Sequence, residues 1–535
     1  MKELKWRDQI FKKYSPQPGF AQAYLHEESG NYVMKYSIGQ SVVYSPFFFV
    51  GHAWALNSSV YPADGFSFPY QFTISMGMLL WTVIGLIFLQ KSLLVYFSEK
   101  VTALGILGIV LGSNYLNYVA IDGAMTHNTV FTVYSVLIYL SIQFYQKPNW
   151  GKAIGIGACV GLASLIRPTE IISCLIPILW GVNLLNKEDI FKRLEVFKAN
   201  GIKLTMAVVV TAMVGFIQLA YWKYATGDWI VYSYQDQGFS WLKPHIYNGI
   251  LSYRTGWLVY SPLMVFSLIG FITLFRKDKG VFYPTFIFSM LFIYIAFAWD
   301  IWWYGGSLGQ RTMVQAYPIL LFPFCAFIAW VLSPRKLWIK VGIGAITVLF
   351  IYANLWFTHQ AHLGGILKVS RMKKKYFWKT LFTYEIDRND IKLLDTVDEL
   401  FEGERKNVRI MHHDTDFDKT LDKENQYSGK IKILASEFTE PYDWVRVSAD
   451  VYTEHKEWTL WKMTQFIVDF KDQDKTIRHQ MFRVQNLLDS HNKTRLYLDV
   501  RKPEQAFSDL EILFWNSDSP NPIQISDLKV EIFEE

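Results

Sequence analysis

A few ionisable residues stand at the ends of long apolar stretches, where placing a charge costs free energy and therefore suggests a function. Asp122 and His127, in "IDGAMTH", could accept a proton or orient a hydroxyl group. Arg167, in "SLIRPTE", could contact an anion. Arg311, in "WWYGGSLGQRTM", could do the same beside the free N–H groups at the start of a helix. Side chains of these types could together move a proton and hold a negative charge.

Each of these residues also has a purely structural interpretation. Asp122 and His127 could belong to the N-terminal cap of a helix over 127–146. Arg167 could pair with Glu170 and close the turn between two helices. Arg311 could extend to lipid phosphates at the membrane surface. The sequence alone leaves these alternatives open.

The loop 224–255 holds the densest mixture of polar and aromatic side chains. Trp and Tyr often form a belt at the membrane interface, but a belt does not explain the charged residues interleaved with them. A cleft for a phosphorylated sugar needs cations for the phosphate, aromatic faces for the ring, and acids for the hydroxyl groups. The candidate substrate-binding residues of this loop and of the segment 300–311 are Asp236, Lys243, His245, Arg254, Trp302 and Trp303.

The elements that must hold these residues are membrane helices. Of the 535 residues, 51% are hydrophobic, yet the mean hydropathy is only +0.14. The chain must therefore combine a strongly apolar part with a polar part. Apolar windows long enough to cross a bilayer recur over 71–358 and then stop. We predict about ten spans, at 71–90, 101–119, 127–146, 152–166, 169–186, 203–223, 256–275, 281–299, 312–332 and 338–358.

Short basic loops between the apolar segments set the orientation. If the spans alternate, these loops all fall on one side, which the positive-inside rule assigns to the cytoplasm. The candidate residues then lie on the outer face of the cytoplasmic membrane. The loops also account for the net charge of +6, so nothing indicates a nucleic-acid partner.

Residues 1–70 form an outer-face loop in this topology. Their apolar stretch 41–56 is short and contains Pro46 and His52, which favours a re-entrant or interfacial helix over a span. Neither a signal peptide nor a spanning helix precedes this stretch, so we expect the chain to lack a first membrane helix.

The chain after residue 358 is soluble in character. Residues 359–427 form a charged linker that begins with a basic, aromatic stretch typical of a membrane-surface anchor. From 428 to 535, short alternating strands predict an antiparallel β-sandwich. The linker sequence "HHDTD" (412–416) has the composition of a metal cluster, but we interpret it as a solvated turn. The predicted fold is therefore a mainly α polytopic membrane protein with a C-terminal antiparallel β-sandwich domain.

The membrane part resembles the GT-C type glycosyltransferases of the dolichyl-phosphate-mannose mannosyltransferase and aminoarabinose transferase group. Diffuse patterns over roughly residues 30 to 360 carry this resemblance. They are "KYSIGQSVVYSPFFFVGH", "YPADGFSFPYQ", "IDGAMTH", "SLIRPTE", "ATGDWIVYSYQDQGFSWLKPHIYNGILSYRTGWLVYSP" and "WWYGGSLGQRTMVQAYPIL". The last strands, "LEILFWNSDSPNPIQISDLKVEIFEE", are similar to those of carbohydrate-binding modules.

The resemblance implies transfer of a sugar from a polyprenyl phosphate to a glycan or protein acceptor outside the cytoplasmic membrane. In the family an acidic residue acts as base, and its principal acidic motif follows the first spanning helix. Asp122 would take the second acidic position. Lys243, His245, Arg254 and Arg311 would contact the lipid-linked phosphate and stabilise its charge as it leaves. A divalent cation is possible, but no metal ligands are assigned.

Two other functions remain open from the sequence. A non-catalytic membrane scaffold of the same fold could use its outer β-sandwich to bind glycans or proteins. A secondary transporter would need polar residues deep within broken helices. Here the polar groups gather at one end of the spans, so the transporter ranks last.

Overall fold

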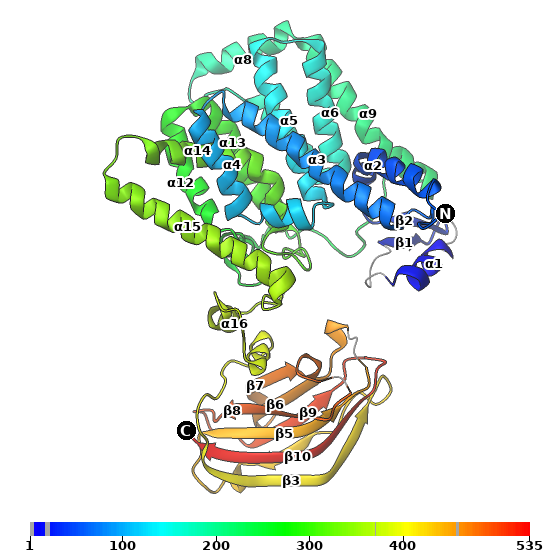
Figure 1. Ribbon diagram of the computed structural model, residues 1–535, viewed down its shortest axis with the longest axis vertical. Coiled ribbons are helices and arrows are strands. Elements are labelled where there is room, and N and C mark those ends of the chain that lie inside the picture. The colour runs from blue at the N-terminus through cyan, green and yellow to red at the C-terminus, as the bar shows by residue number, and fades with distance from the viewer. Residues whose placement is uncertain (1–4, 16–21, 370, 456–458, 490) are drawn as a thin grey trace. The chain divides into compact units, whose positions relative to one another are not determined.

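The computed structural model describes residues 5–15, 22–369, 371–455, 459–489 and 491–535. The chain divides into two compact units, Met1–Ser370 and Arg371–Glu535. The first unit is mostly helical, and the second consists mainly of β-strands (Figure 1).

The first unit begins with a short helix and a two-stranded hairpin, α1 (Lys5–Tyr14), β1 (Ala23–His26) and β2 (Asn31–Met34). Its long helices are α2 (Gly39–Leu56), α3 (Phe68–Leu93), α4 (Glu99–Gly112), α5 (Thr126–Gln146), α6 (Trp150–Ile166), α8 (Lys187–Ala199), α9 (Gly201–Thr226), α12 (Val265–Lys277), α13 (Lys279–Ala298), α14 (Tyr317–Leu332) and α15 (Leu337–His359). Its described residues also form the short α-helices α7 (Leu175–Leu179), α10 (Ile246–Leu251) and α11 (Trp257–Tyr260), and several 3-10 and π-helical turns.

Five of the described helices are long and apolar enough to cross a membrane. They are Phe68–Leu93, Gly201–Thr226, Lys279–Ala298, Arg311–Leu332 and Leu337–Gly364. The prediction of a mostly helical protein with apolar spans is confirmed, but the predicted number of about ten is not. Several predicted spans are interrupted; the stretch 169–186, for example, forms a 3-10 helix and the five-residue α7.

The predicted short helix at 41–56 is present as α2, an 18-residue helix that contains Pro46. Phe49, Val50 and Leu56 on this helix are exposed. Because α2 is not one of the five candidate spans, its outward apolar side chains fit the predicted interfacial or re-entrant position, which remains a prediction.

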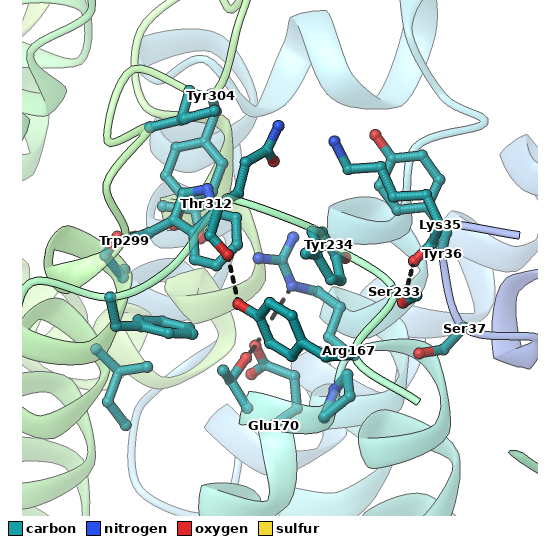
Figure 2. A pocket seen from close by; sticks show the side chains of 18 of the residues that line it. Lys35, Tyr36, Ser37, Arg167, Glu170, Ser233, Tyr234, Trp299, Tyr304 and Thr312 are labelled. Carbon is teal, nitrogen blue, oxygen red and sulfur yellow. Dashed lines mark hydrogen bonds and ion pairs between the residues drawn. The ribbon is translucent and has the colours of Figure 1, made fainter. Parts of the chain in front are cut away.

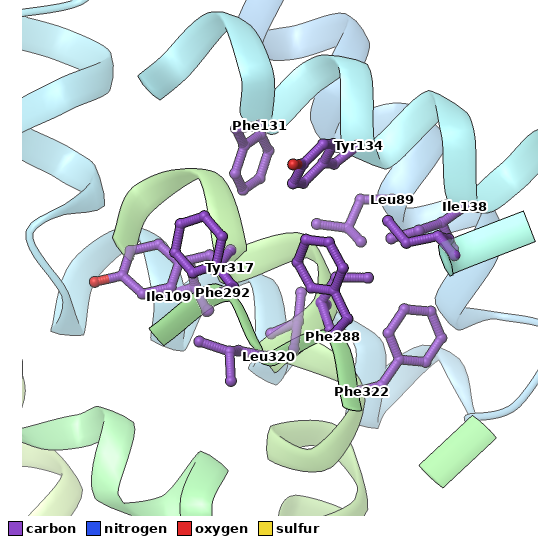
Figure 3. Close-up of a cluster of buried hydrophobic side chains, with 14 of the residues drawn as sticks. Leu89, Ile109, Phe131, Tyr134, Ile138, Phe288, Phe292, Tyr317, Leu320 and Phe322 are labelled. Carbon is purple, nitrogen blue, oxygen red and sulfur yellow. The ribbon is translucent and has the colours of Figure 1, made fainter. Parts of the chain in front are cut away.

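The core of the first unit gathers side chains of α3, α4 and α5 together with those of two further helices, α13 and α14. Figure 3 shows Phe131, Tyr134 and Ile138 of α5 near side chains of those two helices. Tyr134 meets Phe288 of α13 edge to face, with ring centroids 5.5 Å apart. Within a bilayer such helices associate through close packing and internal hydrogen bonds rather than through exclusion of water.

Glycines allow two of these helix pairs to touch along their backbones. A Cβ atom at Gly270 of α12 would lie 2.0 Å from the carbonyl oxygen of Pro323 in α14. At Gly157 of α6 it would lie 2.2 Å from the carbonyl oxygen of Ala207 in α9. Any side chain at either position would therefore push the helices apart.

The second unit contains two four-stranded antiparallel sheets, ordered β3-β10-β5-β8 and β4-β9-β6-β7. The strands are β3 (Lys406–Leu421), β4 (Ile431–Leu434), β5 (Trp444–Tyr452), β6 (Gln465–Asp472), β7 (Lys475–Arg483), β8 (Thr494–Arg501), β9 (Asp509–Trp515) and β10 (Ile523–Glu534). Every pairing within these sheets is antiparallel, as predicted. Apolar side chains such as Val445, Val447 and Val451 alternate into the core.

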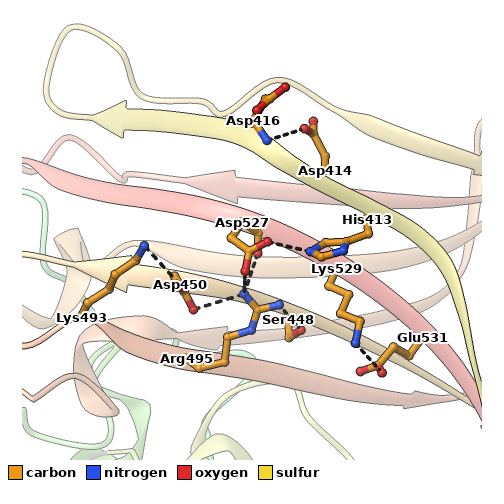
Figure 4. A network of polar contacts seen from close by, with 10 residues as sticks. All are labelled: His413, Asp414, Asp416, Ser448, Asp450, Lys493, Arg495, Asp527, Lys529 and Glu531. Carbon is orange, nitrogen blue, oxygen red and sulfur yellow. Dashed lines mark hydrogen bonds and ion pairs between the residues drawn. The ribbon is translucent and has the colours of Figure 1, made fainter.

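Strand β3 corrects two expectations, because it lies in the predicted linker and contains the predicted turn at 412–416. Most of its side chains are exposed, so the apolar alternation that marks a half-buried strand is absent. Figure 4 shows His413 within a charged network on this sheet. Its Nε2 lies 2.8 Å from Asp527, and Arg495 Nη1 lies 2.8 Å from the same carboxylate. Charges on an edge strand also discourage pairing with other chains.

Candidate functional site

A cavity of about 490 Å³ opens in the first unit. It is lined by five segments that are far apart in the sequence: 35–37, 167–172, 230–239, 292–305 and 311–312, with Trp222 of α9. Figure 2 shows Arg167, Glu170, Tyr234 and Tyr304 around it. The volume and the mixture of aromatic and charged side chains are typical of a small-molecule site.

Arg167 reaches the cavity because the chain breaks at this residue. Pro168 cannot continue α6, so Arg167 takes an extended conformation, with φ −143° and ψ 115°, between α6 and the 3-10 helix Pro168–Cys174. Its Nε lies 3.7 Å from Glu170 Oε1. The expected Arg167–Glu170 pair is therefore present, and the same arginine also lines the cavity.

Glu170 is a buried carboxylate whose hydrogen bonds are supplied by its neighbours. The Gln315 Nε2 atom donates to Oε1 at 2.6 Å, and the Tyr134 hydroxyl donates to Oε2. Gln315 Oε1 in turn lies 3.0 Å from His127 Nδ1, whose ring is 3.4 Å from Arg167 Nη1. This network fixes the arginine in place, because each member is held by at least one other.

Arg311 lies at the start of the 3-10 helix Arg311–Ala316 and lines the cavity. Its Nη1 contacts Met125 Sδ at 3.7 Å, and its buried Nε has no hydrogen-bond partner among the described residues. A buried, unsatisfied guanidinium N–H is costly unless a ligand accepts from it. Arg311 therefore suits an anion in the cavity better than a lipid phosphate at the surface.

Lys35 is the third cation of the cavity, and the sequence analysis did not single it out. The segment that carries it is held on α9, where Met34 N donates to the Tyr221 hydroxyl at 3.1 Å. The Ser233 hydroxyl donates to the Lys35 carbonyl at 2.7 Å. The Lys35 ammonium lies 5.5 Å from the ring centroid of Tyr234, a favourable cation–π distance. Burial lowers the pKa of Lys35, and the charge of Asp236 opposes this only in part.

We expect anion binding in the cavity to weaken at alkaline pH for this reason. Lys35 is charged below its folded pKa, which lies under the ordinary 10.5, and its attraction for an anion is lost as the pH rises through that value. Burial raises the pKa of Tyr234 and of Tyr304, so these phenols stay neutral as Lys35 titrates. Affinity for a polyprenyl phosphate, measured from neutral to alkaline pH, should fall in the wild type and stay flatter in Lys35→Arg. An identical profile in both would contradict this role.

The other predicted binding residues are not among those that line the cavity. The guanidinium of Arg254 lies 4.1 Å from the ring centroid of Trp303, and His245 lies 6.4 Å from Trp302, centroid to centroid. Lys243 and Asp236 are exposed, although Asp236 acts electrostatically on Lys35. Of the predicted substrate-binding residues, Arg167 and Arg311 line the cavity.

Asp122 and His127 occupy different environments. Asp122 follows a π-helical turn (Asn117–Ile121) and accepts a hydrogen bond from Asn117 Nδ2 at 2.9 Å. The alternative role as an N-terminal cap is wrong, because Met125 holds that position and no side chain caps α5. His127 is buried in the network of Gln315 and Arg167 and is not among the residues that line the cavity. One group of described residues could hold a metal ion, His26, Glu28 and Asp228, and it lies outside the cavity lining.

Comparisons with known proteins found a weak structural likeness and no match of sequence. No family model matches the chain, and no curated protein matches it. Among solved structures, the chain is similar to arabinosyltransferase EmbB from Mycobacterium smegmatis, with a TM-score of 0.33 and 9% sequence identity. The match covers 90% of this chain and 59% of EmbB, so the chain spans less than two thirds of that protein's length. A likeness this weak carries no argument about substrate.

Proposed function

We propose that this chain is a multi-pass membrane glycosyltransferase that moves a sugar from a polyprenyl phosphate to a glycan or protein acceptor. The reaction takes place at the outer face of the cytoplasmic membrane, where the second unit also lies. The observation that carries the proposal is the charge balance of the cavity. Lys35, Arg167 and Arg311 line it, whereas its one buried carboxylate, Glu170, is already bound by neighbouring side chains.

A phosphate group suits this balance. Arginine guanidinium groups bind phosphate oxygens through parallel N–H donors, and Lys35 adds a point charge. The Arg311 Nε that has no partner among the described residues is then satisfied. The three cations together exceed what Glu170 neutralises, so an anionic ligand gains free energy on entering.

The walls of the cavity also suit a lipid chain. Trp222 belongs to α9, and Phe292 and Ile295 belong to α13, two of the five helices that are long and apolar enough to cross a membrane. A polyprenyl phosphate can therefore place its phosphate beside the cations and its hydrocarbon chain against these helices. The aromatic rings of Tyr234, Trp299 and Tyr304 offer apolar faces to a sugar ring.

The proposed chemical step is a substitution at the anomeric carbon of the donor sugar. The oxygen of the acceptor hydroxyl bonds to the anomeric carbon as the bond from that carbon to the phosphate oxygen breaks. The leaving polyprenyl phosphate gains negative charge, which Arg311 and Arg167 stabilise more strongly than they stabilise the donor. In this proposal Asp122 receives the acceptor's proton. Asp122 is not among the residues that line the cavity, but it lies three residues before Met125, which Arg311 contacts.

The proposal is tested by supplying the purified full-length protein with radiolabelled polyprenyl-phosphate sugars and an extract of envelope glycans. We expect release of free polyprenyl phosphate coupled to transfer of label. Donor turnover that continues unchanged in Asp122→Asn would remove Asp122 from the mechanism. Complete absence of turnover with every polyprenyl-phosphate pentose and hexose would contradict the proposed function.

A further inference from the structure

A second cavity, of about 400 Å³, lies entirely within the second unit. It forms where the segment 379–402 lies over strand β8, the last strand of the sheet β3-β10-β5-β8. This segment begins at the end of α16 (Lys374–Thr380) and contains the 3-10 helix Arg388–Leu394. The volume is in the range of pockets that hold small ligands, roughly 300–1,000 Å³.

Lys392 is the feature of this cavity that needs an explanation. Its side chain is only 2% exposed, yet it lines the cavity. The ammonium lies 3.7 Å from the ring centroid of Tyr497 and 5.4 Å from that of Phe482. Among the described residues it has no ion-pair or hydrogen-bond partner, and burial lowers its pKa to about 7. The charge of Asp499 acts on Lys392, but no described side chain accepts a hydrogen bond from it, so a ligand could supply the acceptor.

The acids around Lys392 are held by other groups. Asp499 receives two hydrogen bonds from Arg446, from Nε at 2.6 Å and from Nη2 at 2.7 Å. Lys379 lies 3.5 Å from Asp390 and also pairs with Glu402. Asp390, Glu402 and Asp499 also line the cavity, and a carboxylate oxygen can accept more than one hydrogen bond, so these paired acids could still accept from a ligand.

We propose that this cavity binds a neutral saccharide unit, with the Lys392 amine donating to a sugar oxygen and the carboxylates of Asp390 and Asp499 accepting from sugar hydroxyl groups. The site is separate from the transfer cavity of the first unit. It would let the second unit hold a glycan whether or not the chain is a transferase.

The charges of the lining favour a neutral ligand with both donors and acceptors. An anion would meet four carboxylates, from Asp387, Asp390, Glu402 and Asp499, against the two cations Lys379 and Lys392. A cation would meet the buried amine of Lys392 at the wall. A sugar hydroxyl group can donate to an acid and accept from an amine, so a saccharide satisfies both kinds of group.

The test is saturation-transfer-difference NMR on the purified full-length protein with the neutral methyl glycosides of glucose, galactose, mannose and arabinose. We expect at least one glycoside to bind the wild type, and Lys392→Met to weaken that binding about tenfold or more, since the sugar oxygen loses its hydrogen-bond donor. Lys502→Met is the matched control. Lys502 also lies over a tyrosine ring, 4.6 Å from the centroid of Tyr442, but outside the cavity.

A second variant tests the cavity independently, in case Lys392→Met fails to fold. Asn389 lines the cavity and is only partly buried, so Asn389→Leu should block the space without disturbing the core. We expect it to weaken binding as strongly as Lys392→Met. The proposal is overturned if none of the four glycosides binds the wild type, or if both cavity variants bind as the wild type does. Because this readout does not involve donor turnover, its failure is distinguishable from failure of the proposed transferase activity.

Discussion

Replacing Arg311 with alanine should lower sugar transfer by roughly 10²–10³-fold, the cost of removing one preorganised donor from a developing negative charge. The reason is the position of the side chain. It lines the cavity beside Arg167, and its buried Nε has no partner among the described residues. The loss should appear mainly in kcat, because the charge on the phosphate is greatest when the sugar leaves. The measurement is the rate of polyprenyl phosphate release under saturating donor.

Arg335→Ala is the matched control for this prediction. Arg335 lies beyond the other end of α14, where its guanidinium is 4.8 Å from the ring centroid of Trp330. It therefore shares the chemistry of Arg311 without the cavity. We expect Arg335→Ala to keep wild-type turnover. Equal turnover in Arg311→Ala and Arg335→Ala would show that Arg311 serves the fold or the membrane surface instead.

Replacing Glu170 with alanine should have the largest effect on stability, about 3–5 kcal/mol, because it removes the buried carboxylate of an ion pair and leaves the half-buried Arg167 without its partner. Tyr134 and Gln315 would lose the acceptor for their hydrogen bonds in the same step. The effect is measured as the shift in the unfolding transition of detergent-solubilised protein, followed by fluorescence during titration with a denaturing detergent.

Two variants sharpen this second prediction. Glu170→Gln keeps an acceptor oxygen and the volume of the side chain, so it should lose less stability than Glu170→Ala. Glu99→Ala removes an exposed acid from the first turn of α4 and should change the free energy of unfolding by about 0.5 kcal/mol or less. If Glu170→Ala and Glu99→Ala unfold alike, the buried network does not hold the cavity together.

Apolar length alone located much of the helical fold. The stretches 71–90, 203–223 and 281–299 correspond to α3, α9 and α13, because an uninterrupted apolar segment has few alternatives to a helix in a membrane. The number of spans could not be read in the same way. Within the predicted span 169–186 the helix ends at Leu179, and no proline or glycine before that residue marks its end in the sequence except Pro177 inside α7.

The site was partly visible in the sequence. Arg167 and Arg311 stood out as charges within apolar surroundings, and both line the cavity. Lys35 carried no such signal, because it follows a short strand among other polar residues. Gln315 lies in an apolar run, and its role becomes visible only in the structure, where it contacts Glu170 and His127. Residues that meet through tertiary contacts cannot be grouped by their spacing.

The central claim, that the cavity of Arg167 and Arg311 binds the lipid-linked phosphate, can be tested by a cryo-EM structure of the full-length protein in nanodiscs with undecaprenyl phosphate. We predict phosphate density within hydrogen-bond distance of the Arg311 and Arg167 guanidinium groups, with the hydrocarbon chain leaving along Trp222 and α13. Phosphate density beside His245 and Arg254 instead, with the cavity free of lipid, would contradict it.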